Sequence, residues 1–163
     1  MPDTITRDEA FRKLAARCSA KECCVAEVRE KLHNWNIPRK EEDSIVEQLL
    51  KENYIDEARY CRAYAQDQFR FSGWGRIKIG YTLRQKQIDP LTVSQSMKVI
   101  DETEYVETLL RILKSKYRGL KSVDPSLQGE KLMRFAVSRG FEIELIKKCL
   151  RELSVECTVG SEI

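Results

Sequence analysis

The stretch Leu83-Arg-Gln-Lys-Gln-Ile88 contains a five-residue step from one apolar side chain to the next. The same step occurs twice more, from Leu32 to Ile37 and from Ala136 to Phe141. The second positions of these pairs, 37, 88 and 141, are 51 and 53 residues apart. A period of this size is typical of chains built from repeated helical units. We therefore predict structural roles for Ile37, Leu83, Ile88 and Phe141 at equivalent places in three units.

Each step lies between two segments with helical periodicity. Apolar residues at spacings of three and four precede it, and a partner helix follows it, with apolar pairs at Ile45/Leu49, Val93/Met97 and Ile146/Leu150. This spacing places the pairs on one face of a helix. No segment alternates apolar and polar residues with period two, and only seven glycines and four prolines are present. The sequence therefore predicts an all-α protein of nine helices in three groups of three.

The period also predicts the domain organisation. We expect three-helix repeats at 1–53, 54–100 and 101–153, followed by a flexible tail at 154–163. About 50 residues is small for an independent core, so neighbouring repeats should pack on one another. Tandem helical units of this kind form elongated, curved arrays that present a long surface to a large partner.

Local signals mark several helix ends. Thr6 and Glu9 form a capping box, and Asp56 is placed to cap the helix that follows it. Ser72-Gly73-Trp74-Gly75 has two glycines around an aromatic residue, which predicts a hinge. Gly119 and Gly140 each follow a basic helical segment and should end it.

The composition contains no catalytic constellation. The one histidine, His33, has no second ligand or base at helical spacing, so we predict a surface or boundary position for it. Acidic pairs such as Glu41/Glu42 are predicted to be solvated at helix starts. The six cysteines form no C-x-x-C pair and lie mostly at apolar helical spacing, which favours reduced, buried side chains. We expect no enzyme activity, no metal and no cofactor.

The chain has no sign of membrane insertion or secretion. Its beginning, MPDTITRDEAF, lacks a basic region followed by an apolar stretch, and no run approaches 18 apolar residues. We therefore expect a cytoplasmic protein that does not contact membranes.

Basic residues cluster in the middle of the chain. Residues 57–88 contain seven basic and two acidic side chains, although the whole chain has a net charge of only +3. Arg76, Lys78, Arg84 and Lys86 surround one predicted helix, whose inner face holds Ile79 and Leu83. Such a face suits phosphates or an acidic protein groove, but an ordinary solvated helix face remains an alternative.

A second basic run lies in the third predicted repeat. Residues 111–121 contain five basic side chains and no acid, after an acidic stretch at 101–110. Acidic residues near the start of a helix and basic residues near its end complement the helix dipole. This run is therefore explained equally well by helix stability and by binding.

Three motifs resemble the RecX family, whose members regulate the bacterial recombinase RecA. They are Tyr54-Ile-Asp-Glu-Ala-Arg-Tyr60, then Gly75-Arg-Ile-Lys-Ile79 leading to Leu83–Ile88, and finally Arg139-Gly-Phe141. The likeness extends from about residue 8 to 153. It implies a non-enzymatic protein of tandem three-helix repeats that lodges in the groove of the RecA filament and usually inhibits strand exchange and ATP hydrolysis. Some members also bind DNA.

The resemblance also implies site residues. Asp56, Arg59, Lys78 and Arg84 match family positions, as do Lys86 and Arg139. Together with the basic faces of the middle and last repeats, this predicts partner contacts by Arg59, Arg76, Lys78, Arg84, Lys86, Arg134 and Arg139. The chain departs from the family at four positions: Asn53 and Gln87 replace glycines, Cys24 replaces a helix-capping serine, and Gly80 replaces a basic residue.

Three hypotheses follow. The first is a monomeric regulator that binds the RecA–DNA filament and modulates recombinase activity, with inhibition as the expected direction. Its setting would be homologous recombination and DNA repair within the SOS response. The second is a stand-alone helical module that binds single- or double-stranded DNA without RecA. The third is a generic protein-interaction scaffold.

Overall fold

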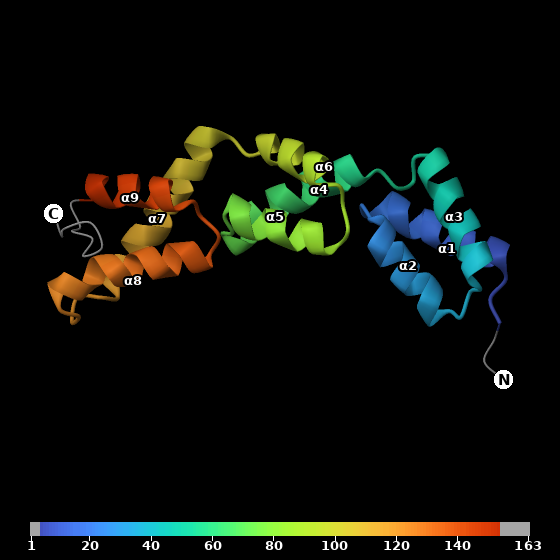
Figure 1. The fold of residues 1–163 in the computed structure, drawn as a ribbon, viewed down its shortest axis with the longest axis horizontal. Coiled ribbons are helices and arrows are strands. Elements are labelled where there is room, and N and C mark those ends of the chain that lie inside the picture. Colours follow the sequence, from blue (N-terminus) through green and yellow to red (C-terminus); the bar gives the residue numbers. More distant parts are fainter. Residues whose placement is uncertain (1–3, 154–163) are drawn as a thin grey trace. The chain divides into compact units, whose positions relative to one another are not determined.

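The structure is a computed structural model that describes residues 4–153, so the tail predicted at 154–163 lies outside it. The described residues form helices and no strand, which confirms the all-α prediction (Figure 1). The nine α-helices are α1 (Arg7–Ala20), α2 (Val25–Asn34), α3 (Arg39–Lys51), α4 (Glu57–Asp67), α5 (Arg76–Gln85), α6 (Pro90–Ser96), α7 (Glu102–Arg118), α8 (Pro125–Ser138) and α9 (Ile143–Glu152). A π-helical turn, η1 (Gln68–Ser72), follows α4, and a 3₁₀ turn, η2 (Met97–Val99), follows α6.

Between residues 4 and 153, no helix combines the length and the apolar character needed to cross a bilayer.

The predicted helix caps are present. Thr6 and Glu9 make the reciprocal capping box before α1. The Asp56 carboxylate accepts a hydrogen bond of 3.0 Å from the backbone N–H of Arg59. Asp101, which the sequence did not single out, caps α7 in the same way, through the N–H of Glu104 at 2.9 Å. Each cap satisfies a backbone donor that has no partner inside its helix.

The five-residue step is a helix ending. The N–H of Ile37 donates to the carbonyl of Leu32 at 3.0 Å, and the N–H of Phe141 donates to the carbonyl of Ala136 at 3.2 Å. These bonds reach five residues back and belong to the Schellman motif, which also brings the two apolar side chains together at the helix end. The step thus ends one helix and sets the start of the connection to the next.

A left-handed residue precedes the second apolar residue of each step. Asn36 has a φ of 56°, Gln87 of 63° and Gly140 of 94°. Asn53, with a φ of 62°, ends α3 in the same way, and there the N–H of Tyr54 donates to Leu49. Asn53 and Gln87 are the two positions where the resemblance implies glycine, the residue that adopts this conformation without steric cost.

The described chain divides into two compact units. Within the described residues, one comprises 4–63 with Leu83–Ser96, and the other comprises Tyr64–Thr82 with 97–153. Helices α4 and α5 each contribute residues to both units. The middle predicted repeat, 54–100, is therefore shared between them, and the three domain boundaries stay a prediction.

In the first unit, α1 and α2 both pack on α3. Leu14, Leu32, Ile45 and Leu49 are fully buried there, and the predicted anchor Ile37 joins the same core. All cysteines of the described chain, namely Cys18, Cys23, Cys24, Cys61 and Cys149, are buried and free, as predicted.

One expectation for this unit is wrong. Glu42 is not solvated: its side chain is fully buried. Its two carboxylate oxygens lie 2.9 Å from Nη1 of Arg29 and 2.7 Å from Nε2 of His33. These partners are four residues apart on α2, so they share one face. A buried carboxylate needs such partners, because desolvation of a lone charge is costly. His33 is exposed, as predicted.

In the second unit, α7, α8 and α9 pack on one another. A row of buried rings joins them to η1: Phe69 lies 5.6 Å from Tyr105, and Tyr105 lies 5.1 Å from Phe141, between ring centroids. The Tyr105 hydroxyl accepts from the backbone N–H of Arg76 at 2.9 Å and donates to Glu142. Burial, together with the hydrogen bond to Glu142, raises the pKa of Tyr105 well above its usual range. The hydroxyl therefore stays protonated and keeps its donor.

Two backbone segments of this unit run in direct contact. The N–H of Gly75 donates to the carbonyl of Arg139 at 2.7 Å, and the N–H of Ile77 donates to that of Gly140 at 3.0 Å. A Cβ at Gly75 would lie 2.4 Å from the Gly140 carbonyl, and one at Gly140 would lie 2.4 Å from Cβ of Lys78. Neither position has room for a side chain. Gly75 and Gly140, which belong to motifs of the family resemblance, are therefore required by packing.

We predict that Gly75→Ala destabilises the protein by about 3 kcal/mol, because the new methyl group would separate the two backbones. Gly119→Ala is the matched control, since its Cβ would meet only a carbonyl at 3.4 Å, and it should change stability by less than about 0.5 kcal/mol. Urea unfolding followed by circular dichroism measures both. Equal stability of the two variants would contradict the close approach.

We predict that Gln87→Gly stabilises the protein by about 0.5–1 kcal/mol, because glycine removes the strain of a positive φ and this gain exceeds its own entropic cost. Glu47→Gly, at an exposed position inside α3, should instead destabilise by about 1 kcal/mol. The same unfolding measurement applies. A loss of stability in Gln87→Gly would show that the left-handed conformation of Gln87 does not destabilise the protein.

Candidate partner-binding surfaces

The seven predicted contact residues do not all belong to one unit. Arg59, Arg84 and Lys86 are in the first unit, and Arg76, Lys78, Arg134 and Arg139 are in the second. Most of them make contacts within their own unit. These contacts decide which cations are available to a partner, so they are described first.

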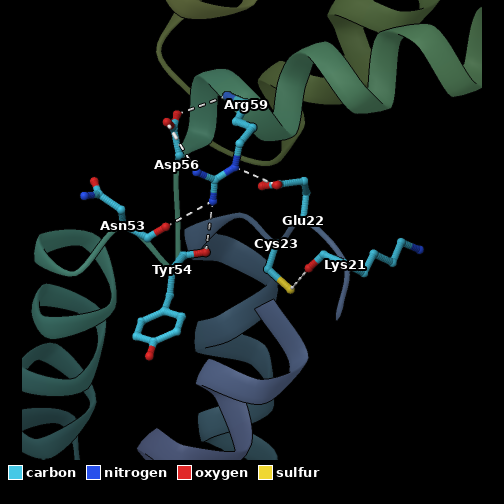
Figure 2. Close-up of polar contacts among 7 residues, drawn as sticks. All are labelled: Lys21, Glu22, Cys23, Asn53, Tyr54, Asp56 and Arg59. Carbon is cyan, nitrogen blue, oxygen red and sulfur yellow. Dashed lines mark hydrogen bonds and ion pairs between the residues drawn. The ribbon is translucent and has the colours of Figure 1, made fainter. Parts of the chain in front are cut away.

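Arg59 is held by four neighbours (Figure 2). Its Nε lies 2.6 Å from the carboxylate of Glu22, and its Nη2 donates to the carbonyls of Asn53 at 3.1 Å and Tyr54 at 3.5 Å. Asp56 lies 3.8 Å away. The hydrogen bond to Glu22 raises the pKa of Arg59 above its already high value. The guanidinium thereby links the segment between α3 and α4 to the segment between α1 and α2.

Arg76, the first residue of α5, is similarly engaged. It forms ion pairs with Glu102 and, at 3.0 Å, with Glu142, which lie at the starts of α7 and α9. Its guanidinium carbon lies 3.9 Å from the ring centroid of Tyr105. One side chain therefore joins the beginnings of three helices of the second unit.

The remaining predicted cations differ in availability. Lys86 pairs with Glu27 at 3.3 Å, Arg134 pairs with Glu130 one turn away, and Lys78 lies 4.5 Å from the ring centroid of Trp74. Arg84 is exposed, and the described chain offers it no ion pair or ring contact. Whether these residues contact a partner stays a prediction.

The structure reveals a groove that the sequence did not indicate. It lies in the second unit beside η1, α7 and α8, and its volume is about 580 Å³. Four cations line it: Arg70, Arg111, Lys116 and Arg139. No carboxylate is among the described residues that line the groove. Of the seven predicted cations, Arg139 is the one found in this lining.

The turn η1 forms one wall of the groove. Gly73, with a φ of 68°, ends the turn, and the N–H of Trp74 reaches back to the carbonyl of Gln68 at 3.2 Å. Nη1 of Arg139 donates to the carbonyl of Ser72 at 3.0 Å and so ties the turn to the end of α8. As a result Phe71 is 84% exposed. The hinge predicted at residues 72–75 therefore follows directly on a π-helical turn, Gln68–Ser72, whose Phe71 ring is exposed.

The other wall carries most of the unpaired charge. On α7, Arg111 is exposed and has no ion pair in the described part of the chain. Nζ of Lys116 and the guanidinium of Arg139 lie 4.9 and 5.1 Å from the ring centroid of Phe135. Arg70 lies 3.6 Å from Glu104, which offsets part of its charge.

The positive charge continues along α7. Lys114 and Arg118 line an adjoining hollow of about 440 Å³ together with Arg111 and Glu107. Three basic residues of the run at 111–121, Arg111, Lys114 and Arg118, therefore face solvent at a concave surface. The run was visible in the sequence, but its proximity to Phe71 and Arg139 depends on contacts between residues far apart in the chain.

Between residues 4 and 153, the His, Cys, Asp and Glu side chains form no group of three suited to holding a metal ion.

Comparisons with known proteins identify two domains of one family. A model described as "RecX, second three-helix domain" matches residues 56–97, and one described as "RecX, third three-helix domain" matches residues 102–150. Together they match more than half of the chain. Both matches lie inside the second and third predicted repeats.

Curated relatives have the same family name. "Regulatory protein RecX" of Clostridium botulinum (strain Eklund 17B / Type B) is 28% identical over 131 residues, which cover 77% of this chain and 59% of the relative. "Regulatory protein RecX" of Clostridium perfringens (strain 13 / Type A) is 29% identical over 133 residues, covering 78% and 60%. The chain thus spans about three fifths of the length of these relatives.

Solved structures show the same fold. The crystal structure of RecX from Lactobacillus salivarius is similar with a TM-score of 0.81 at 17% identity, covering 92% of this chain and 97% of that one. A crystal structure titled "regulatory protein RecX" also has a TM-score of 0.81, at 16% identity, covering 89% and 71%.

We predict that Arg59→Lys lowers stability by about 1–2 kcal/mol although it keeps the charge, because lysine cannot hold Glu22 and two carbonyls at once. Arg62→Lys is the matched control: Arg62 is exposed on the same helix and should tolerate the change. Urea unfolding of both variants tests this. If Arg59→Lys is as stable as the control, the described contacts do not hold these segments together.

Proposed function

The chain belongs to the RecX family, and we propose that it is a non-enzymatic regulator that binds the filament formed by the recombinase RecA on DNA. The observation that carries the proposal is the match of two successive RecX three-helix domains, supported by the likeness to solved RecX folds. We expect inhibition of strand exchange and of the coupled ATP hydrolysis, in the cytoplasm and in the setting of DNA repair.

The charges of the described chain support binding through many weak contacts. Arg84 in the first unit, and Arg111, Lys114 and Arg118 in the second, are exposed without an ion pair in the described residues. A contact between exposed charges contributes only about 0–1 kcal/mol and is screened by salt. Binding to a filament should therefore require several of these contacts together and should weaken as ionic strength rises.

The direct test is retention on RecA filaments assembled on single-stranded DNA, together with the DNA-dependent ATPase rate of RecA. The proposal expects retention at low salt, loss at high salt, and a lower ATPase rate. A protein that is not retained at low salt and leaves the ATPase rate unchanged would refute it.

A second candidate is a DNA-binding module that acts without RecA. The observation that favours it is the cationic groove, which has exposed aromatic surface beside it and no carboxylate in its described lining. Binding to naked DNA with a steep dependence on salt, combined with an unchanged RecA ATPase rate, would select this candidate over the first.

We predict that Arg84→Glu weakens inhibition of the RecA ATPase by about fivefold, because it reverses a charge that pairs with no carboxylate between residues 4 and 153. Lys148→Glu is the matched control: Lys148, on α9, is also exposed and unpaired in the described residues, but it is not among the predicted contact residues. Inhibition curves with folded variants measure the effect. Equal potency of the two would remove Arg84 from the contact surface.

A further inference from the structure

The groove beside η1 combines two features that differ chemically. Its cations, Arg70, Arg111, Lys116 and Arg139, create a positive field, since no carboxylate is in the described lining and Glu104 outside it offsets only part of the charge of Arg70. A concave surface with one sign of charge concentrates ligands of the opposite sign. The ligand should therefore carry several negative charges.

The second feature is the ring of Phe71. Its side chain is 84% exposed, so it contributes little to the core, whereas Phe69 two residues earlier is buried. The turn that carries it is fastened by Gly73 and by the hydrogen bond from Arg139 to Ser72. The ring is therefore held at the edge of the groove by rigid backbone, and packing within the protein does not explain its place there.

We propose that this groove binds a single-stranded nucleic-acid segment, with a base stacked on Phe71 and neighbouring phosphates held by Arg111 and Lys116. Positively charged grooves with exposed aromatic rings are the usual design for single-strand binding, because every base has a face that can stack. A duplex does not fit as well, since its bases already stack on one another and leave none for Phe71.

The cations have separate roles within the site. Arg139 is a positioning residue, because its guanidinium is bonded to Ser72 and lies against Phe135. Within residues 4–153, Arg111 makes no ion pair and so can meet phosphates, and Nζ of Lys116 lies over the ring of Phe135 and makes no ion pair. Lys114 and Arg118 continue the charge on α7, and the span from 111 to 118 corresponds to about 10 Å of helix.

This inference deepens the proposed function and rests on it for its setting, because the proposed partner is a RecA filament assembled on single-stranded DNA. The binding reaction itself needs no RecA. It can therefore be measured with the full chain and naked oligonucleotides, so that the groove and the proposed function succeed or fail separately.

The test is fluorescence anisotropy of the full chain with three labelled probes of equal phosphate number: a 15-residue oligothymidylate, an abasic 15-mer of the same backbone, and a duplex. Oligothymidylate should bind most tightly. Phe71→Ala should weaken its binding about 5- to 100-fold and leave binding of the abasic chain unchanged. Phe71→Tyr should restore oligothymidylate binding, because tyrosine also stacks.

Charge removal gives an independent readout. Lys116→Gln and Arg111→Gln should each reduce the slope of log affinity against log salt by about 0.7. Lys148→Gln removes an exposed charge from α9 of the same unit and should leave the slope unchanged. An oligouridylate of the same length tests whether the site distinguishes ribose from deoxyribose. Binding as tight as that of oligothymidylate would support a general single-strand site.

Several results would overturn the proposal. They are equal binding of the abasic chain, tighter binding of the duplex, an unchanged affinity in Phe71→Ala, or displacement of the oligonucleotide by polyglutamate at equal charge, which would indicate an acidic protein ligand. Inhibition of the RecA ATPase without any oligonucleotide binding would refute this inference alone. Oligonucleotide binding without any effect on RecA would refute the proposed function alone.

Discussion

A left-handed residue just past a helix end is the constraint on which the other features depend. In the described chain it occurs at Asn36, Asn53, Gly73, Gln87 and Gly140. At each place the backbone folds back on the last turn of the helix, which satisfies carbonyls that would otherwise lack partners. The same geometry buries the apolar residue that follows at Ile37, Ile88 and Phe141. At Gly140 the residue also lies so close to Gly75 and Lys78 that neither glycine has room for a side chain, and at Gly73 it ends the turn that carries Phe71.

The second organising feature is the use of positive charge. The sequence predicts partner contacts for Arg59, Arg76 and Arg139. In the structure, each of these guanidinium groups is instead held by carboxylates, carbonyls or rings of its own unit. Guanidinium groups suit this role because they donate several hydrogen bonds in one plane. The charges left for a partner are those without such neighbours, and three of them in the second unit, Arg111, Lys114 and Arg118, lie together on α7.

These observations separate what the family likeness explains from what it leaves open. Gly75, Gly140 and Phe141 belong to motifs of the RecX resemblance, and the structure accounts for them by close backbone approach and by core packing. Such residues preserve a fold, so they carry little information about a partner. The proposed regulation of RecA depends instead on exposed groups such as Arg84, Arg111 and Phe71, which the fold does not require.

The sequence by itself determined the helices, their caps, the three apolar steps and the reduced cysteines, because these depend on residues at most five positions apart or on simple apolar periodicity. It did not predict that Glu42 is buried, since that depends on two partners from another helix. Nor did it predict the groove, in which Arg139 reaches Ser72 from 67 positions away. Only the tertiary structure decided which cations are neutralised and which aromatic ring is exposed, because contacts between helices that are far apart in the sequence set the burial and pairing of each side chain.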